Sequence, residues 1–429
     1  MLSIELSPIA WSQNKAVQQS HSQPPADMNM VDMNAASMFL MNLASGTAAN
    51  PAAWTMPMLM KPFGSWNASF MAEAFLVDTQ QTGPRGSDKL FSPNWFMANA
   101  EHRAGQNGAV QFQLMISLEP ATITDRRYPL LFQTGETAFG KPIIDAQHPH
   151  DFIMSLGVQY AHTLGENAVL ELYLAPVGDP ALGPVAYPHR ASAMELPQAT
   201  ITHHWQDSTH IANDVVTVGV SYKKFKLEAS GFHGAEPDEF RWDIDSGAVN
   251  SWSTRLWYFP TAEWAAQFSA GHLTHPEALE PGDQMRTTAS LHYSKPLTHG
   301  DWSSSFIWGR NHSTNTKRNT NSYTIESLLP IYKKNFVTGR IELVDKDELF
   351  AGQPGIEELL ERYAGSTFRI GAYTIGYTRD FQAFRYVATG IGANIEAYSV
   401  SRSIKPYYGD HPIGGNVFLR FRLKNSHAN

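Results

Sequence analysis

The stretch 203-HHWQDSTH-210 gathers three imidazoles, a carboxylate and two hydroxyl groups within eight residues. Imidazole and carboxylate groups are ligands that suit Zn²⁺, Cu²⁺, Ni²⁺ or iron, so this stretch is a candidate metal site. A hydrolytic site would need a serine presented as a nucleophile, and no G-x-S-x-G motif frames a serine of this chain. We therefore predict metal chemistry rather than catalysis, and a protein that is not an enzyme.

Three more polar clusters could contribute to the same site: 145-DAQHPHD-151, 233-HGAEPDEFRWD-243 and 272-HLTHPEALEPGD-283. We expect Asp207 or Asp238 to hold the imidazole tautomers. The alternative is that the histidines are hydrogen-bonded packing residues of folded loops, because no spacing matches a zinc motif such as H-E-x-x-H. The predicted ligands are His148, His150, Asp151, His203, His204, His210 and His233.

Methionines form a second constellation. Eight of the 15 methionines lie between residues 28 and 60, and the chain has no cysteine. An alternative that is compatible with metal binding is a helix over 32–43, which would start at Asp32 and plug the interior of the protein. That helix would contact the surrounding wall through Met38, Phe39 and Met41. Because thioether sulfur is a soft ligand that selects Cu(I), this segment is also a candidate copper site through Met28, Met30, Met56, Met58 and Met60.

The elements that would position these side chains are strands. Beyond residue 61, apolar residues recur with period two in segments of about ten residues. Between 110 and 118, Val110, Phe112 and Leu114 fall on one face, and Gln111 and Gln113 fall on the other. The pattern predicts antiparallel strands with one apolar and one polar face. The same alternation appears in 168–175, 215–222, 287–294 and 417–423.

The connections between these strands alternate in length. Seven short turns and eight long polar connections predict sixteen strands, with both chain ends on the short-turn side. A soluble sandwich or propeller would also alternate, but no repeat of about 40–50 residues indicates a propeller. We predict an all-β fold, an antiparallel transmembrane β-barrel of about 16 strands in the bacterial outer membrane, with the His-rich loops on one rim. The long connections are expected at 79–92, 120–150, 177–208, 234–250, 273–284, 312–320, 345–365 and 399–412.

Composition limits the partners of the chain. The formal net charge of −8 excludes a basic nucleic-acid-binding protein, so lipid of the outer membrane is the expected environment. Ala10-Trp11-Ser12 is typical of the end of a signal peptide, and an ordinary N-terminus is the alternative. We expect a signal-peptide remnant over 1–12, a Met-rich segment over 13–60 in the periplasm or the lumen, and the barrel over 61–429.

Four stretches resemble a family of bacterial outer-membrane proteins that has no assigned activity. They are 129-PLLFQTGE-136, 145-DAQHPHDFIMSLGVQY-160, 193-AMELPQATITHHWQDSTHI-211 and 234-GAEPDEFRWD-243. The similarity covers roughly residues 44–310, and in the family, as here, a Met-rich stretch and Ser-Gly-Thr precede the shared motifs. Ala235 stands where the family has arginine before Glu-Pro-Asp, which leaves that arginine without a counterpart. The resemblance implies an outer-membrane barrel and no particular reaction.

These observations predict a channel, or a transport component linked to a transition metal such as copper or zinc. The alternative is a structural barrel that anchors a periplasmic or surface partner, such as an electron-transfer protein. The two differ in whether the barrel interior is open or is filled by residues 25–60.

Overall fold

The computed structural model describes residues 33–278, 282–332, 334–351, 362–363 and 365–424. The predicted signal-peptide remnant, Met28 and Met30 lie outside these residues, so the division of the chain at residues 12 and 60 stays a prediction. No helix in the described part of the chain is both long and apolar enough to cross a membrane.

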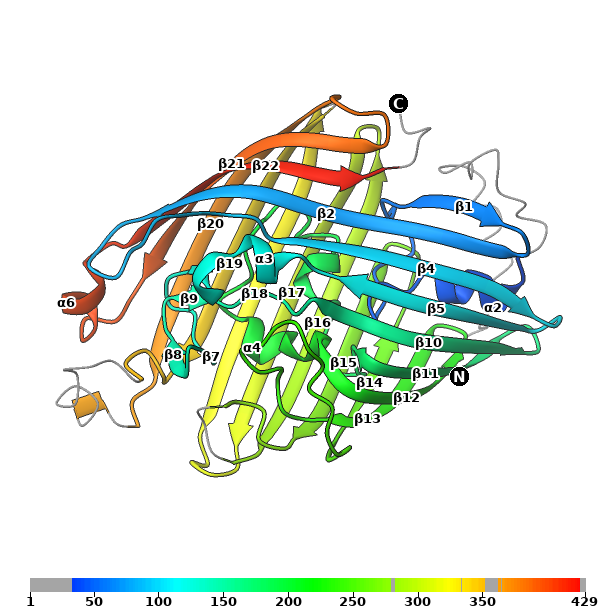
Figure 1. Ribbon diagram of the computed structural model, residues 1–429, viewed down its shortest axis with the longest axis horizontal. Helices are drawn as coiled ribbons and strands as arrows, with labels where there is room; N and C mark the ends of the chain where they lie inside the picture. The colour runs from blue at the N-terminus through cyan, green and yellow to red at the C-terminus, as the bar shows by residue number, and fades with distance from the viewer. Residues whose placement is uncertain (1–32, 279–281, 333, 352–361, 364, 425–429) are drawn as a thin grey trace, which may run out of the picture.

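Sixteen long antiparallel strands of the described residues close into a barrel, which confirms the predicted fold (Figure 1). The ring closes where β2 pairs with β22, from Glu73 opposite Arg422 to Gln81 opposite Gly414. Two short strands, β1 (Leu59–Phe63) and β3 (Lys89–Phe91), also pair with β2. The long strands are β2 (Trp66–Gln81), β4 (Asn94–Ala104), β5 (Gly108–Ile116), β10 (Ile153–Leu164), β11 (Ala168–Gly178), β12 (Ala212–Tyr222), β13 (Phe225–His233), β14 (Ser251–Tyr258), β15 (Trp264–Leu273), β16 (Gln284–Leu297), β17 (Gly300–Ser313), β18 (Asn319–Tyr332), β19 (Asn335–Lys346), β20 (Phe368–Phe381), β21 (Val387–Ser399) and β22 (Ile413–Leu423).

Side chains alternate across the barrel wall as the sequence predicted. In β5, Phe112 and Leu114 are 52% and 42% exposed on the outside, whereas Gln111 and Gln113 are buried inside. The outer face is a belt of large apolar side chains, and the inner face is largely polar. Strands arranged in this way cross a bilayer with every backbone group paired and with apolar side chains against lipid.

Connections alternate around the barrel, seven at one end and eight at the other. Figure 1 shows α6 (Lys405–Tyr408) at the end of the barrel opposite β1 and α2 (Ala35–Met41). One connection is shorter than predicted, because residues 314–318 are all that separate β17 from β18, where a loop over 312–320 was expected. The eight connections are 82–93, 117–152, 179–211, 234–250, 274–283, 314–318, 347–367 and 400–412.

The long connections carry most of the short elements. The connection 117–152 holds two small two-stranded sheets, β6 with β9 and β7 with β8. These elements are α3 (Glu119–Thr122), η2 (Thr124–Arg126), β6 (Tyr128–Pro129), β7 (Glu136–Ala138), β8 (Lys141–Ile143), β9 (Ala146–Gln147), η3 (Tyr187–His189), α4 (His203–Gln206) and η4 (Ser208–His210).

Loop 179–211 fills much of the lumen, since every one of its residues is buried. Connections on a protein surface expose polar residues, so a loop of this length without exposed residues has folded into the barrel. It is tied to opposite walls. Ala181 N donates to Ser230 of β13 at 2.8 Å, and Asn416 Nδ2 of β22 donates to Gln198 Oε1 at 2.7 Å. The loop therefore crosses the interior, as loops do in plugged barrels.

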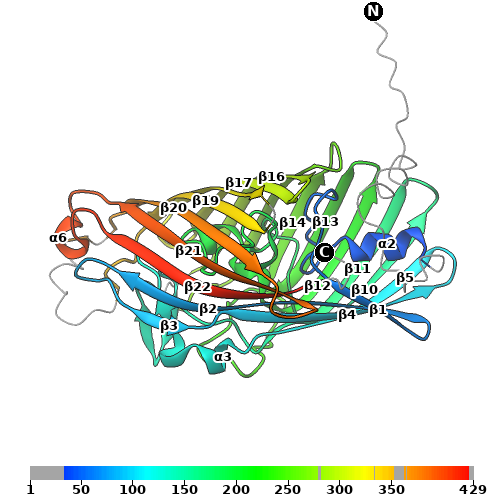
Figure 2. The same ribbon diagram turned by 90° about the horizontal axis from the view of Figure 1, so that it is seen from above.

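The N-terminal segment, residues 33–58, also lies in the lumen. Figure 2 shows α2 beside β5 and β10, the strands with which it is in contact. The hydroxyl of Ser37 donates to Glu101 of β4 at 2.5 Å, and Lys226 Nζ of β13 donates to the Thr47 carbonyl at 2.7 Å. The described part of the segment thus occupies the interior, while residues 13–32 lie outside the described residues.

The helix of this segment differs in detail from the predicted one. It covers Ala35–Met41 rather than 32–43, and Asn34 caps it by accepting from Ser37 N at 2.9 Å. Asp32, the predicted cap, lies outside the described residues. Residues three and four positions apart share one face of a helix, and small residues let that face approach the wall closely. The buried face is Ala36, Ser37 and Leu40. Of the predicted contacts, Phe39 packs against a buried cluster that includes the wall residues Ala109 and Val169, which confirms that contact. Met38 and Met41 are only partly buried.

Candidate metal centre

The stretch 203–210 forms α4 and η4 near the end of loop 179–211. Trp205 Nε1 donates to Thr320 of β18 at 2.7 Å, and Asn311 Nδ2 of β17 donates to the His204 carbonyl at 3.0 Å. Gly309 of β17 allows this close approach, because a Cβ atom there would lie 2.2 Å from the Trp205 carbonyl oxygen. These contacts with the barrel wall therefore hold α4 in place and restrict the orientation of the His204 ring.

Five side chains from four long connections meet at this point. We call Glu136, His148, His204, Glu236 and Glu277 the His204 cluster. One ligand atom each from Glu136, His148 and His204 lies within 4.8 Å of the others, and so does one each from His204, Glu236 and Glu277. His204 Nδ1 is 3.4 Å from a carboxylate oxygen of Glu236 and 3.4 Å from one of Glu277. His148 Nδ1 is 3.5 Å from Glu136 Oε1.

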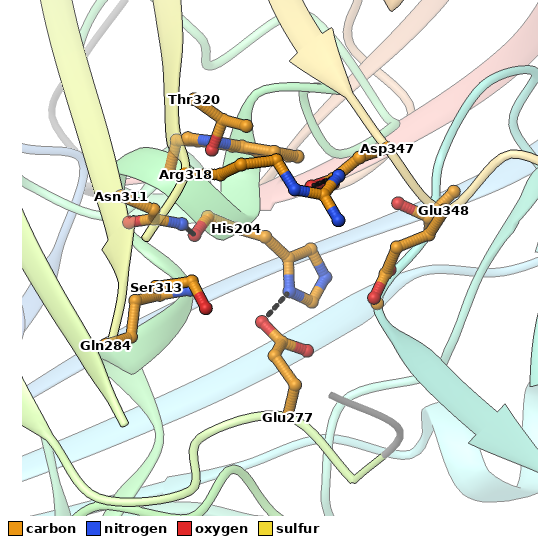
Figure 3. A pocket seen from close by; sticks show the side chains of 12 residues that line it. His204, Glu277, Gln284, Asn311, Ser313, Arg318, Thr320, Asp347 and Glu348 are labelled. Carbon is orange, nitrogen blue, oxygen red and sulfur yellow. Dashed lines mark hydrogen bonds and ion pairs between the residues drawn. The ribbon is translucent and has the colours of Figure 1, made fainter. Parts of the chain in front are cut away.

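A polar pocket adjoins the cluster. Its volume is about 450 Å³, and its lining includes His204, Glu277, Asn311 and Arg318. Figure 3 shows the His204 ring turned toward the Glu277 carboxylate within this pocket. A cation that enters the pocket would therefore reach one imidazole and one carboxylate of the cluster.

Polar atoms of the cluster lack hydrogen-bond partners within the described residues. Both ring nitrogens of His204 and Oε2 of Glu277 are buried and accept or donate no hydrogen bond there. The contacts at 3.4 Å are close enough for ion pairing but do not have hydrogen-bond geometry. Leaving a buried polar atom without a partner costs about 1–3 kcal/mol, so water or a ligand in the adjoining pocket would stabilise this arrangement.

Burial and the neighbouring charges shift the pKa values of the cluster. Burial lowers the pKa of His204, but the carboxylates of Glu236 and Glu277 outweigh burial and hold that pKa well above its usual value. Burial raises the pKa of Glu136 well above its usual value, although Arg241 opposes this. Burial, reinforced by Arg241, lowers the pKa of His148, which keeps its ring neutral and able to ligate.

Gly135 explains part of the geometry. Its φ of +124° is one that side-chain-bearing residues rarely adopt, and a Cβ atom there would lie 2.8 Å from Nδ1 and Cε1 of His204. Gly135, in the stretch 129-PLLFQTGE-136, thus lets the backbone pass close to the His204 ring. The next residue, Glu136, is thereby placed in the cluster.

Other predicted ligands take different positions. His203 Nδ1 lies 2.8 Å from Asp207 Oδ1, and His210 Nδ1 donates to the Asp207 carbonyl at 2.8 Å. The His210 ring packs against those of His203 and His150, with centroids 5.2 and 5.4 Å apart. Burial lowers the pKa of His203 and, well below its usual value, that of His210. This packed group of rings matches the predicted scaffolding role, with Asp207 as the expected tautomer-setting partner.

Three further expectations need correction. Asp151 pairs with Arg241 at 3.5 Å, which occupies its carboxylate with a cation of the chain. His233 Nδ1 donates to the Ala248 carbonyl at 2.9 Å, away from the cluster. Asp238 lies in a separate acidic group with Asp243 and Asp245, so it does not orient a histidine of the cluster. Among the described residues, no group of three closely spaced ligand atoms includes His150, Asp151, His203, His210 or His233.

Residues that the sequence did not single out complete the cluster. Glu136, Glu236 and Glu277 each lie inside one of the polar stretches of the sequence, but their convergence depends on how four loops fold. Of the predicted methionines, Met56 and Met58 pack in part against a buried cluster of the barrel wall, and Met60 lies in β1 opposite Ser69.

Comparisons with solved structures identify the fold. The chain is similar to an anion-selective porin from Comamonas acidovorans, with a TM-score of 0.53 and 11% identity over 83% of this chain and 100% of that one. It is also similar to Salmonella typhi OmpF in complex with daunomycin, with a TM-score of 0.51 and 9% identity over 85% of this chain and 100% of that one. No protein-family model and no curated protein sequence matches the chain. The fold is thus that of a bacterial outer-membrane porin barrel.

Proposed function

We propose that this outer-membrane barrel is a transport channel with a closed lumen, linked to a transition-metal site at its long-loop end, the His204 cluster. The observation that carries the proposal is that two triads of ligand atoms share His204, with Glu136 and His148 in one and Glu236 and Glu277 in the other, and that both nitrogens of His204 are left without hydrogen-bond partners among the described residues. Imidazole with carboxylate suits Zn²⁺ or Cu²⁺.

The spacing of the ligand atoms supports a tetrahedral ion. Ligands at about 2.0–2.1 Å from a tetrahedral Zn²⁺ lie roughly 3.4 Å from one another. The contacts of His204 Nδ1 with Glu236 and Glu277 are both 3.4 Å, and that of His148 with Glu136 is 3.5 Å. Two such triads share His204, and the ligand atoms of each lie within 4.8 Å of one another, so each triad offers three ligands to one ion.

The position of His204 supports a link between the metal and transport. Its backbone belongs to loop 179–211, which fills the lumen, while its side chain meets carboxylates of two other long connections. A bound ion would therefore tie the lumen-filling loop to the outer rim. Loss of the ion would leave repelling carboxylates, which favours movement of the loop.

Titration of the purified chain in detergent with Zn²⁺ and with Cu²⁺ tests the proposal. We expect saturable binding of about one ion, and at least tenfold weaker binding for His204→Gln. The matched control is His233→Gln, since His233 lies outside the cluster. Equal binding by His204→Gln and the parent, or no binding by the parent, would refute the metal link.

Burial of loop 179–211 also favours the second candidate, a structural barrel that anchors a periplasmic or surface partner. An anchoring barrel does not require an open pore through its lumen. Conductance across planar bilayers separates the two functions. Metal-dependent or loop-dependent conductance supports transport, and a bilayer that stays closed with metal, without metal and with a loosened loop favours anchoring.

A further inference from the structure

Four methionines form a row on the inner wall of the barrel. Met71 of β2 lies opposite Met97 of β4, and Met97 lies opposite Met115 of β5. Met154 of β10 precedes Ser155, the residue paired with Met115. All four side chains are buried. Directly paired residues on neighbouring strands have Cβ atoms about 4.5–5.5 Å apart, so long side chains in such a row can reach one another.

The N-terminal segment adds two thioethers to this methionine row. Met56 and Met58 pack against the same buried cluster, whose other members are Trp95, Val177 and Ile211. Six of the twelve methionines among the described residues therefore meet at one place inside the barrel. This gathering is independent of the dense methionines at 28–41, because the four wall residues come from four different strands.

The position of the row argues for more than packing. Inward positions of a membrane barrel are ordinarily polar, and on this wall Gln113 and Asn99 place amide nitrogens 3.7 Å from Met97 Sδ. Branched aliphatic residues would fill an apolar gap in a lumen with less loss of side-chain entropy. Methionine instead provides a polarisable sulfur on an unbranched chain that can rotate toward a ligand.

The row lies close to the histidines. Trp95 of the cluster packs edge-on against His189 of loop 179–211, with ring centroids 4.3 Å apart. A cavity of about 370 Å³ is lined by Trp95 on one side and by His150, Glu119 and Tyr187 on the other. Imidazole and carboxylate groups thus line the interior at the long-loop end of the barrel. Thioethers line it nearer the N-terminal segment.

We propose that the methionine row binds a soft monovalent cation of the Cu(I) class. This inference rests on the proposed function and adds a second site with a different metal preference. Thioether ligands select Cu(I) over divalent ions, and the chain has no cysteine that could compete for it. Three sulfurs of Met71, Met97, Met115 and Met154 would hold the ion, and Met56 or Met58 would cover it.

Ag(I) is the probe, because it has the ligand preference of Cu(I) and needs no reductant. Titration of the purified full-length chain in detergent is expected to give one saturable Ag(I) site that the double variant Met97→Leu/Met115→Leu loses, with at least tenfold weaker binding. Leucine conserves volume, so the barrel should remain folded. The matched control is Met194→Leu/Met285→Leu, which changes two methionines outside the row and should bind Ag(I) as the parent does.

A structural measurement checks the ligands directly. X-ray absorption of the Cu(I)-loaded chain should show about three sulfur neighbours, and the double variant should lose them. Ag(I) binding that is equal in the parent and the double variant, or Cu(I) bound mainly by nitrogen and oxygen, would overturn the proposal. His204→Gln separates the two sites, because it should weaken Zn²⁺ binding at least tenfold and leave Ag(I) binding intact. The two titrations therefore show separately whether the zinc site or the Ag(I) site is absent.

Discussion

The hydroxyl of Ser45 donates a 2.8 Å hydrogen bond to the carboxylate of Asp179 inside the barrel. Ser45 belongs to the N-terminal segment, and Asp179 is the first residue of loop 179–211. These two elements, which both place buried residues inside the barrel, therefore contact each other as well as the wall. Each limits the movement of the other, so a change at this contact should loosen both.

Substitution of Gly46 tests this contact. A Cβ atom at Gly46 would lie 2.4 Å from the Asp179 carbonyl oxygen, and the φ of Gly46 is +51°. We expect Gly46→Ala to destabilise the docked segment by about 1–3 kcal/mol, because backbone must shift to accept the methyl group. Hydrogen exchange over residues 43–50, followed by mass spectrometry, should become faster by at least about fivefold.

Gly64→Ala is the control for backbone strain. Gly64 has a similar φ of +62°, but apart from its chain neighbours no atom lies within 4 Å of the position that a Cβ atom would take. Exchange over residues 43–50 should be unchanged in this variant. Equal acceleration in both variants would show that strain elsewhere, rather than the Asp179 contact, controls the segment.

The same contact should depend on pH. Burial raises the pKa of Asp179 to about 7, although Arg255 opposes burial. A free aspartate has a pKa of about 3.9, so between about pH 4 and 7 the docked state binds a proton that the released state does not. The docked state therefore loses stability as pH rises through this window, by at most about 1.4 kcal/mol per pH unit.

Asp179→Asn keeps a hydrogen-bond acceptor for Ser45 and removes the titration. We expect the parent to show faster exchange over residues 43–50 at pH 7.5 than at pH 5, after correction for intrinsic rates, and Asp179→Asn to show little difference. A variant that keeps the slope of the parent would assign the pH dependence to another group.

Much of the barrel could be predicted from the sequence because period-two alternation directly encodes which side chains face lipid. Phe112 and Gln113 are adjacent in the chain and lie on opposite faces of the wall, as predicted. The alternation of connection lengths also predicted the number of strands and the position of the His-rich loops at one end of the barrel. The short connection 314–318 was the exception, since polar residues at the ends of β17 and β18 look like loop residues in the sequence.

The site was harder to predict because it depends on loop folding and strand register. Glu277 joins His204 only because two connections bend toward each other over the lumen. Met97 and Met115 are isolated in the sequence, and only the register of β4 and β5 makes them neighbours. His203 and His210 were predicted as ligands because histidines are closely spaced in this part of the sequence. In the structure their rings pack together.

Metal binding should stabilise the folded barrel. A ligand at a free concentration of 100 times its Kd adds about 2.7 kcal/mol to the free energy of unfolding. We expect Zn²⁺ to raise the thermal midpoint of the parent chain and to have little effect on Glu277→Gln, which removes a carboxylate of the His204 cluster. Asp243→Asn, in the separate acidic group, is the control and should respond to Zn²⁺ as the parent does. The reverse pattern would place the ion in the acidic group.

The buried ion pair of Arg190 should hold loop 179–211 in place. Arg190 Nε donates to Glu326 of β18 at 2.5 Å, and its Nη1 donates to Asp207 at 2.9 Å. All three side chains are buried. Removing one partner of a buried pair leaves uncompensated charge and costs about 3–5 kcal/mol. Arg190→Met should therefore release the loop and raise single-channel conductance across planar bilayers.

Arg126→Met is the matched control for that experiment. Arg126, on the connection 117–152, pairs with Glu239 at 3.3 Å. The side chain of Arg126 is 35% exposed. Exposed pairs contribute about 0–1 kcal/mol, so conductance should stay at the parent level. Because Glu326 also accepts from Arg340 at 3.0 Å, the barrel wall itself should survive the loss of Arg190. A folded Arg190→Met barrel that remains as closed as the parent would mean that the loop is held by its many wall contacts, and that the lumen is sealed rather than gated.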